Sequence, residues 1–173
     1  MNKLKVAYYL VCFLFTQTLF GDLNVSTSQN TSNGDTISAY EDFTSLGSNI
    51  LVSIQTAGTW TSATGIADPL TFPTLPQTAI NSSGKMVVIW LGNDVLTFTQ
   101  SLYGSVYVSG SWLTSLLSDP SSEYVIGNHQ VKISDTGVVV VTWAAYLFST
   151  GTNEARGIYA STYGTWAPII TLP

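Results

Sequence analysis

The sequence predicts an all-β protein made of about three repeated units, each with four antiparallel strands. Two observations support this fold class. From residue 37 onward, short apolar or aromatic runs alternate with Gly, Ser, Asn and Pro breaks, and no amphipathic helical stretch interrupts them. In addition, the segment from Gln77 to Trp90 is repeated 53 residues later, from Gln130 to Trp143.

The N-terminal residues 1–21 are expected to be a secretory signal peptide. Lys3 and Lys5 precede a largely apolar, uncharged run from Val6 to Phe20, which is shorter than the ~20 residues that a membrane span needs. Cys12 is the only cysteine and would be removed with this segment, so the mature chain has no disulfide. This favours a bacterial export product. The sequence therefore predicts a protein that is secreted or held at the cell envelope.

The mature chain is expected to be acidic and to begin with a flexible polar leader, residues 22–36. Loss of Lys3 and Lys5 leaves three of the five basic residues against ten acidic ones, so the net charge moves from −5 to −7. Nucleic-acid binding needs clustered Lys and Arg side chains, and the composition excludes it.

Residues 37–173 form the expected repeat domain, with repeats at about 37–76, 77–129 and 130–173. The equivalent strands of the two full repeats are, in order, 78–81 and 131–134, 86–90 and 138–143, 105–109 and 157–161, and the two strands headed by Trp112 and Trp166. The first repeat has counterparts of strands two to four, at 37–40, at 50–54 and at Trp60, but lacks an opening strand.

Four strands in ~45–50 residues match one propeller blade. Stacked blades cover both faces of each sheet, and the run of four valines from Val138 to Val141 suits such two-sided burial. The sequence thus predicts a β-propeller-like array of about three four-stranded antiparallel blades, the first incomplete. Closed propellers have ~4–8 blades, so a monomer is not expected to close. The expected partners are further copies of the chain or a missing remainder of the propeller. The five tryptophans are expected to fill the spaces between blades.

The segment from Leu75 to Gly84, with Trp90, resembles the degenerate repeats of large secreted β-propeller-like proteins of bacteria. The run from Ser134 to Gly137 is distantly similar to the Asp-box of sialidase propellers, but valines stand where the aromatic residue of that motif belongs. The resemblance therefore implies the repeat class and does not extend to sialidase activity.

Few residues are candidates for chemistry. His129 is expected in an exposed loop, and Asp68, Asp119 and Asp135 are expected to cap turns. No metal site and no cofactor are predicted, and the chain is expected not to be an enzyme.

A weak candidate binding site is Arg156 and Tyr159 with Trp166, which resembles a blade of propeller lectins that hold sugars between blades. The leading hypothesis is an exported, non-catalytic repeat protein or propeller fragment that serves as an interaction scaffold for a protein or glycan. The alternative is a carbohydrate-binding propeller lectin assembled from several chains. A glycosidase-like remnant is the third.

Overall fold

The computed structural model describes residues 24–44, 47–68, 71–94, 99–118, 124–161 and 163–173, and the expected signal peptide lies outside them. The described chain is all-β. The strands are β1 (Val25–Gln29), β2 (Thr36–Thr44), β3 (Gly47–Thr56), β4 (Thr59–Trp60), β5 (Thr64–Gly65), β6 (Thr74–Ile80), β7 (Met86–Asp94), β8 (Thr99–Val108), β9 (Ser111–Leu116), β10 (Tyr124–Ile133), β11 (Val139–Leu147), β12 (Thr152–Ala160) and β13 (Ile170–Thr171). Within the described ranges, no helix has the length and apolar character needed to span a bilayer.

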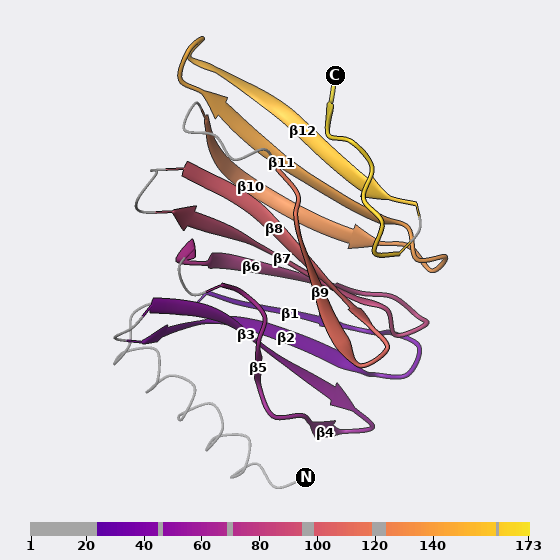
Figure 1. The fold of residues 1–173 in the computed structure, drawn as a ribbon. Helices are drawn as coiled ribbons and strands as arrows, with labels where there is room; N and C mark the ends of the chain where they lie inside the picture. The colour runs from indigo at the N-terminus through magenta and orange to yellow at the C-terminus, as the bar shows by residue number, and fades with distance from the viewer. Residues whose placement is uncertain (1–23, 45–46, 69–70, 95–98, 119–123, 162) are drawn as a thin grey trace, which may run out of the picture.

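The strands form three antiparallel sheets that follow one another in chain order and stack as three layers (Figure 1). We call them blade 1 (β1 to β5), blade 2 (β6 to β9) and blade 3 (β10 to β13). In each blade, neighbours in sequence are neighbours in the sheet; β5 is the exception and pairs with β3. No described sheet closes on itself. The predicted fold class, a propeller-like array that is not closed, is confirmed.

Blade 1 does have an opening strand, which corrects the expectation of an incomplete first blade and of an unstructured leader throughout 22–36. Strand β1 pairs with β2 in continuous register from Val25 to Gln29. Its sequence is polar because its inward side chains bind blade 2 by hydrogen bonds. Ser26 and Ser28 both lie within 3.1 Å of the Thr78 hydroxyl, and the Thr78 amide donates to the Ser26 hydroxyl at 3.0 Å.

The last strand of blade 3 also differs from the expectation. The strand headed by Trp166 was expected to be the fourth, but β13 begins at Ile170 and pairs with β12 through Arg156 and Gly157. Trp166 instead packs against the core between blades 2 and 3. Tyr163, three residues before Trp166, is hydrogen-bonded to blade 2.

The core lies in the two spaces between blades. The first space is filled by apolar side chains of β2 and β3 packed on Met86, Val88 and Trp90 of β7. The second is filled by the opposite face of β7 and by β8, packed on Val139, Val141 and Trp143 of β11. Thus β7 is buried on both sides, as its continuous apolar run predicts. The expectation for the tryptophans holds for Trp90 and Trp143, which are 1% and 2% exposed, but Trp60 is 47% exposed.

Two buried asparagines, Asn30 and Asn81, join each blade to the next by side-chain hydrogen bonds, which we call the inter-blade staples. Asn30, in the β1–β2 turn, donates its side-chain amide to the Ser82 carbonyl at 3.1 Å, and Asn81, in the β6–β7 turn, donates to the Ser134 carbonyl at 2.9 Å. Each side-chain oxygen accepts a backbone N–H of its own turn, from Ser32 and Ser83. These inter-blade staples therefore fix both the turn and the stacking of neighbouring blades.

The Tyr163 hydroxyl forms a second set of hydrogen bonds between blade 3 and blade 2. It lies at the end of the β7–β8 ladder, where it accepts the N–H groups of Met86 and Tyr107 at 3.0 and 3.1 Å. It also faces the carbonyls of the same two residues. Lys85 Nζ lies 5.3 Å from the ring centroid. Burial raises the pKa of Tyr163, so the hydroxyl keeps its proton.

Candidate functional site: a groove between blades 1 and 2

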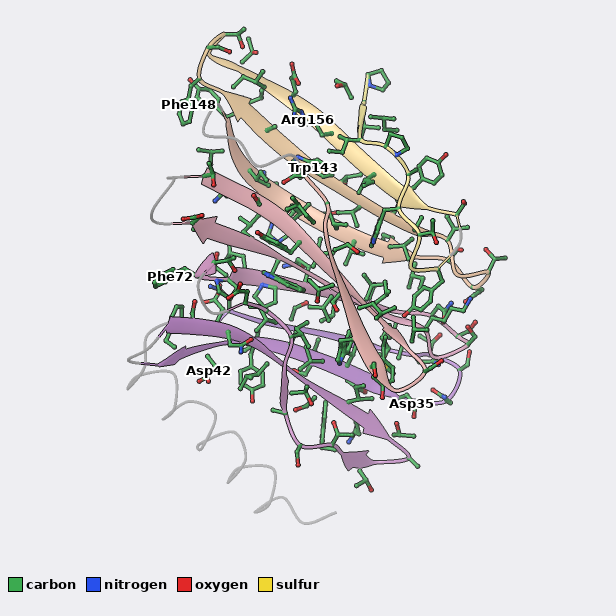
Figure 2. The ribbon with its side chains drawn as sticks, in the orientation of Figure 1. Asp35, Asp42, Phe72, Trp143, Phe148 and Arg156 are labelled. Carbon is green, nitrogen blue, oxygen red and sulfur yellow. The ribbon has the colours of Figure 1, made fainter. Side chains whose placement is uncertain are left out.

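The three residues expected to bind a ligand are not brought together. Because side chains alternate along a strand, Arg156 and Tyr159 of β12 lie on opposite faces of blade 3. Arg156 is the cross-strand partner of Trp143 (both are labelled in Figure 2) and forms an ion pair with Glu154 at 3.1 Å. Tyr159 is exposed on the other face, and Trp166 is half-buried in the core.

A different site lies between blades 1 and 2, in a groove of about 450 Å³. One wall comes from β3 and from the segment that follows β4, and the other comes from β8 and β9. We call it the inter-blade groove, and its lining is Val52, Ile54, Thr61, Ser62, Thr64, Gly65, Ile66, Tyr107, Gly110, Ser111, Trp112 and Thr114.

Local structure on both sides places the polar groups. On blade 1, Thr61 Oγ1 accepts the Ile54 amide at 3.0 Å, which ties the segment after β4 to β3. On blade 2, the turn before β9 needs Gly110 because φ there is +86°, a left-handed conformation. Thr114 Oγ1 donates to the Ile66 carbonyl at 3.3 Å. This hydrogen bond links the two walls of the groove.

The chemistry of the groove is aromatic and hydroxyl-rich, with no charged side chain among its lining residues. Tyr107 and Trp112 form a tilted pair, with ring centroids 5.1 Å apart and an interplanar angle of 49°. Within the described part of the chain, neither the Tyr107 hydroxyl nor the Trp112 indole N–H bonds a protein group. An aromatic surface with hydroxyl groups around it suits a ligand that has both C–H faces and O–H edges.

The sequence did not reveal this site. Trp112 was noticed only as a repeated tryptophan, and the blade 1 wall comes from β3 and from residues 61–66, to which no role was assigned from the sequence. The only available signal was the density of Ser and Thr between Trp60 and Ile66.

The groups singled out for chemistry have structural partners. His129 is buried rather than exposed, because a bulge in β10 turns it inward, and its Nε2 lies 2.7 Å from the Leu75 carbonyl. Burial lowers its pKa, and the hydrogen bond to Leu75 opposes this shift. Asp135 accepts the Ser82 hydroxyl and amide, which lower the pKa of its carboxyl. Asp119 lies outside the described residues.

No cluster of three or more His, Cys, Asp or Glu side chains that could hold a metal ion is present in the described ranges.

No protein-family model matches the chain, and no curated protein matches its sequence. Several solved structures share its fold at low identity. A protein of unknown function from Dyadobacter fermentans matches with a TM-score of 0.56 and 12% identity, over 85% of this chain and 50% of that one. An ulvan lyase, a polysaccharide lyase solved with a bound saccharide, matches with a TM-score of 0.50 and 11% identity, over 82% and 41%.

A fucose lectin from Kordia zhangzhouensis, in complex with methyl-fucoside, has a TM-score of 0.48 and 9% identity, over 83% of this chain and 95% of that one. The chain spans half or less of the length of the first two structures. The likeness to the Dyadobacter protein and to the ulvan lyase supports the β-rich, blade-like fold.

Proposed function

We propose that this chain is a non-catalytic interaction module that binds a neutral saccharide in the inter-blade groove. The observation that carries the proposal is the pairing of Tyr107 with Trp112 in an uncharged groove whose remaining polar groups are mostly hydroxyls. The volume of about 450 Å³ lies within the ~300–1,000 Å³ typical of small-molecule sites.

A sugar ring can lay its C–H face on Trp112 and hydrogen-bond its hydroxyls to the Tyr107 hydroxyl and to Ser62. An anionic saccharide would find no cation in the groove lining to compensate for its lost hydration. The expected ligand class is therefore neutral.

The test is a glycan array followed by calorimetry of the best ligand with the wild-type chain and with Trp112→Ala. Loss of one stacked aromatic group costs about 1–1.5 kcal/mol, which is a loss of affinity of about tenfold. Trp60→Ala is the matched control, because Trp60 is exposed and does not line the groove. An equal loss in both variants, or the absence of any glycan binding, would refute the proposal.

We further propose that the protein is exported through residues 1–21. This rests on the basic start and the short apolar run of the sequence. The measurement is the mass and N-terminal sequence of the protein recovered from the envelope or medium. Recovery of an uncleaved chain from the cytosol would count against export. Turnover of glycoside substrates by the purified chain would count against a non-catalytic role.

A further inference from the structure

The outer face of blade 3 is the face that turns away from blade 2. On β11, Val139, Val141 and Trp143 pack on blade 2, so the alternate residues point the other way. The outer face carries the side chains of Gln130, Lys132, Val140, Thr142, Ala144, Tyr146, Asn153, Ala155 and Tyr159.

This face has a hollow at the positions where the same face of blade 2 carries large apolar side chains. Fifty-three residues earlier, blade 2 has Ile89, Leu91 and Leu102, which are buried against blade 3. Blade 3 has a threonine and two alanines at these positions, namely Thr142, Ala144 and Ala155. The outcome is a hollow of about 490 Å³, which Leu172 bounds on one side by lying over Gly157.

Three side-chain amides border the hollow, on Asn128, Gln130 and Asn153. All three residues are exposed, and none of their side chains bonds a protein group in the described part of the chain. In blade 2 the counterpart of Asn153 is Gln100, whose side-chain oxygen accepts the Ile126 amide of the next blade at 2.5 Å. Asn153 thus exposes to solvent a side-chain amide whose counterpart in blade 2 binds the backbone of the next blade.

A fourth blade is a poor occupant of this face. The inter-blade staples come from Asn30 and Asn81, and the matching residue of blade 3 is Ser134. Its hydroxyl is used within its own turn, where it lies 2.8 Å from Thr136 Oγ1 and accepts the Val138 amide. A blade stacked in the internal manner would lack the staple and would leave a void over the two alanines.

We propose that the hollow on the outer face of blade 3 is a second binding site for a neutral saccharide, separate from the inter-blade groove. Amide groups both donate and accept hydrogen bonds, as a polyhydroxylated ligand requires. Ala144, Ala155 and Leu172 supply an apolar floor for its C–H face. Glu154 is the one charged residue among the described residues that border the hollow, and its side chain lies on the opposite face, where it pairs with Arg156. The choice of ligand class rests on the proposed function, but the two sites share no residue.

The test is a titration of the ¹⁵N-labelled full chain with cellohexaose, xylohexaose and mannohexaose, observed by NMR. Asn153→Ala and Gln130→Ala assign the side-chain NH₂ signals of the hollow, and Trp112→Ala assigns the indole signal of the groove. We expect at least one saccharide to shift the amide signals. We also expect Asn153→Ala to weaken this binding about 3- to 10-fold while the groove titration stays unchanged. Lys132→Ala is the control on the same face outside the hollow and should leave both titrations unchanged.

The possible failures are distinct. If a saccharide moves the Trp112 signal and leaves the amide signals in place, the hollow is not a site and the groove stands. If only the amide signals move, the hollow stands and the groove does not. If no saccharide moves either set, both are overturned. Amide signals that shift with protein concentration alone would show a second copy on this face and would also overturn the proposal.

Discussion

Tyr163→Phe removes a single oxygen and tests whether blades 2 and 3 are held together by the hydroxyl at the end of the β7–β8 ladder. The phenyl ring can stay in place, so the substitution isolates the hydrogen bonds from the packing. The wild-type hydroxyl accepts the N–H groups of Met86 and Tyr107 and donates its one proton to either of their carbonyls.

Three hydrogen bonds at a time are therefore lost. At about 1 kcal/mol each, the expected loss in free energy of unfolding is about 2–3 kcal/mol. The loss in free energy of unfolding is about 2 kcal/mol if, in the variant, the backbone groups of Met86 and Tyr107 bond each other and extend the β7–β8 ladder. For a domain of this size, each kcal/mol lowers Tm by roughly 2–4 °C, so a fall of about 5–10 °C is expected.

The assay is urea unfolding followed by circular dichroism, with Tyr159→Phe as the matched control. Tyr159 is 43% exposed, and the described structure gives its hydroxyl no protein partner. The control should therefore change stability by less than about 0.5 kcal/mol. If Tyr163→Phe also changed stability by less than 0.5 kcal/mol, the hydroxyl would not be a stabilising link between the blades.

Two further predictions concern the staples and the buried histidine. Asn81→Ala should destabilise the fold by about 2–4 kcal/mol in the same unfolding assay, because the Ser134 carbonyl and the amides of Ser83 and Lys85 lose their partner; a loss no larger than that of the exposed Asn153→Ala would contradict it. Burial lowers the pKa of His129 below its ordinary 6.5, so the unfolded chain takes up a proton before the folded chain does. Stability should then fall as pH drops below about 6.5, by up to about 1.4 kcal/mol per pH unit, and His129→Gln should flatten this dependence. An identical pH profile for both proteins would rule out His129 as the cause.

The period of 53 residues predicted the blades well because apolar strands buried on both faces have a strong sequence signal. The strand from Met86 is the clear example. The strand from Val139 is buried on one face only, and Val140 is 43% exposed on the other, so the two-sided burial expected of its valine run is wrong. β1 was missed because its stabilising contacts are hydroxyl–hydroxyl bonds to Thr78, and a Ser/Thr-rich strand is indistinguishable in sequence from a polar leader.

The candidate site was harder to predict for geometric reasons. Residues three apart on a strand lie on opposite faces, so Arg156 and Tyr159 could have been separated from the sequence once β12 was recognised as a strand. The burial of His129 could not, because it depends on a bulge in β10. The inter-blade groove depends on how two blades face each other, and no single repeat encodes that arrangement.

The staples also bear on how the protein can be produced. Asn24, Asn30 and Asn81 each begin an Asn-x-Ser/Thr acceptor sequence for N-linked glycosylation. Yet each side-chain amide is already donated, to Glu41, to the Ser82 carbonyl and to the Ser134 carbonyl. A glycan could be attached at these nitrogens only before folding, and at Asn30 or Asn81 it would then sit between two blades. Production in a host that glycosylates secreted chains should therefore give misassembled protein, and a host without this modification is the suitable source.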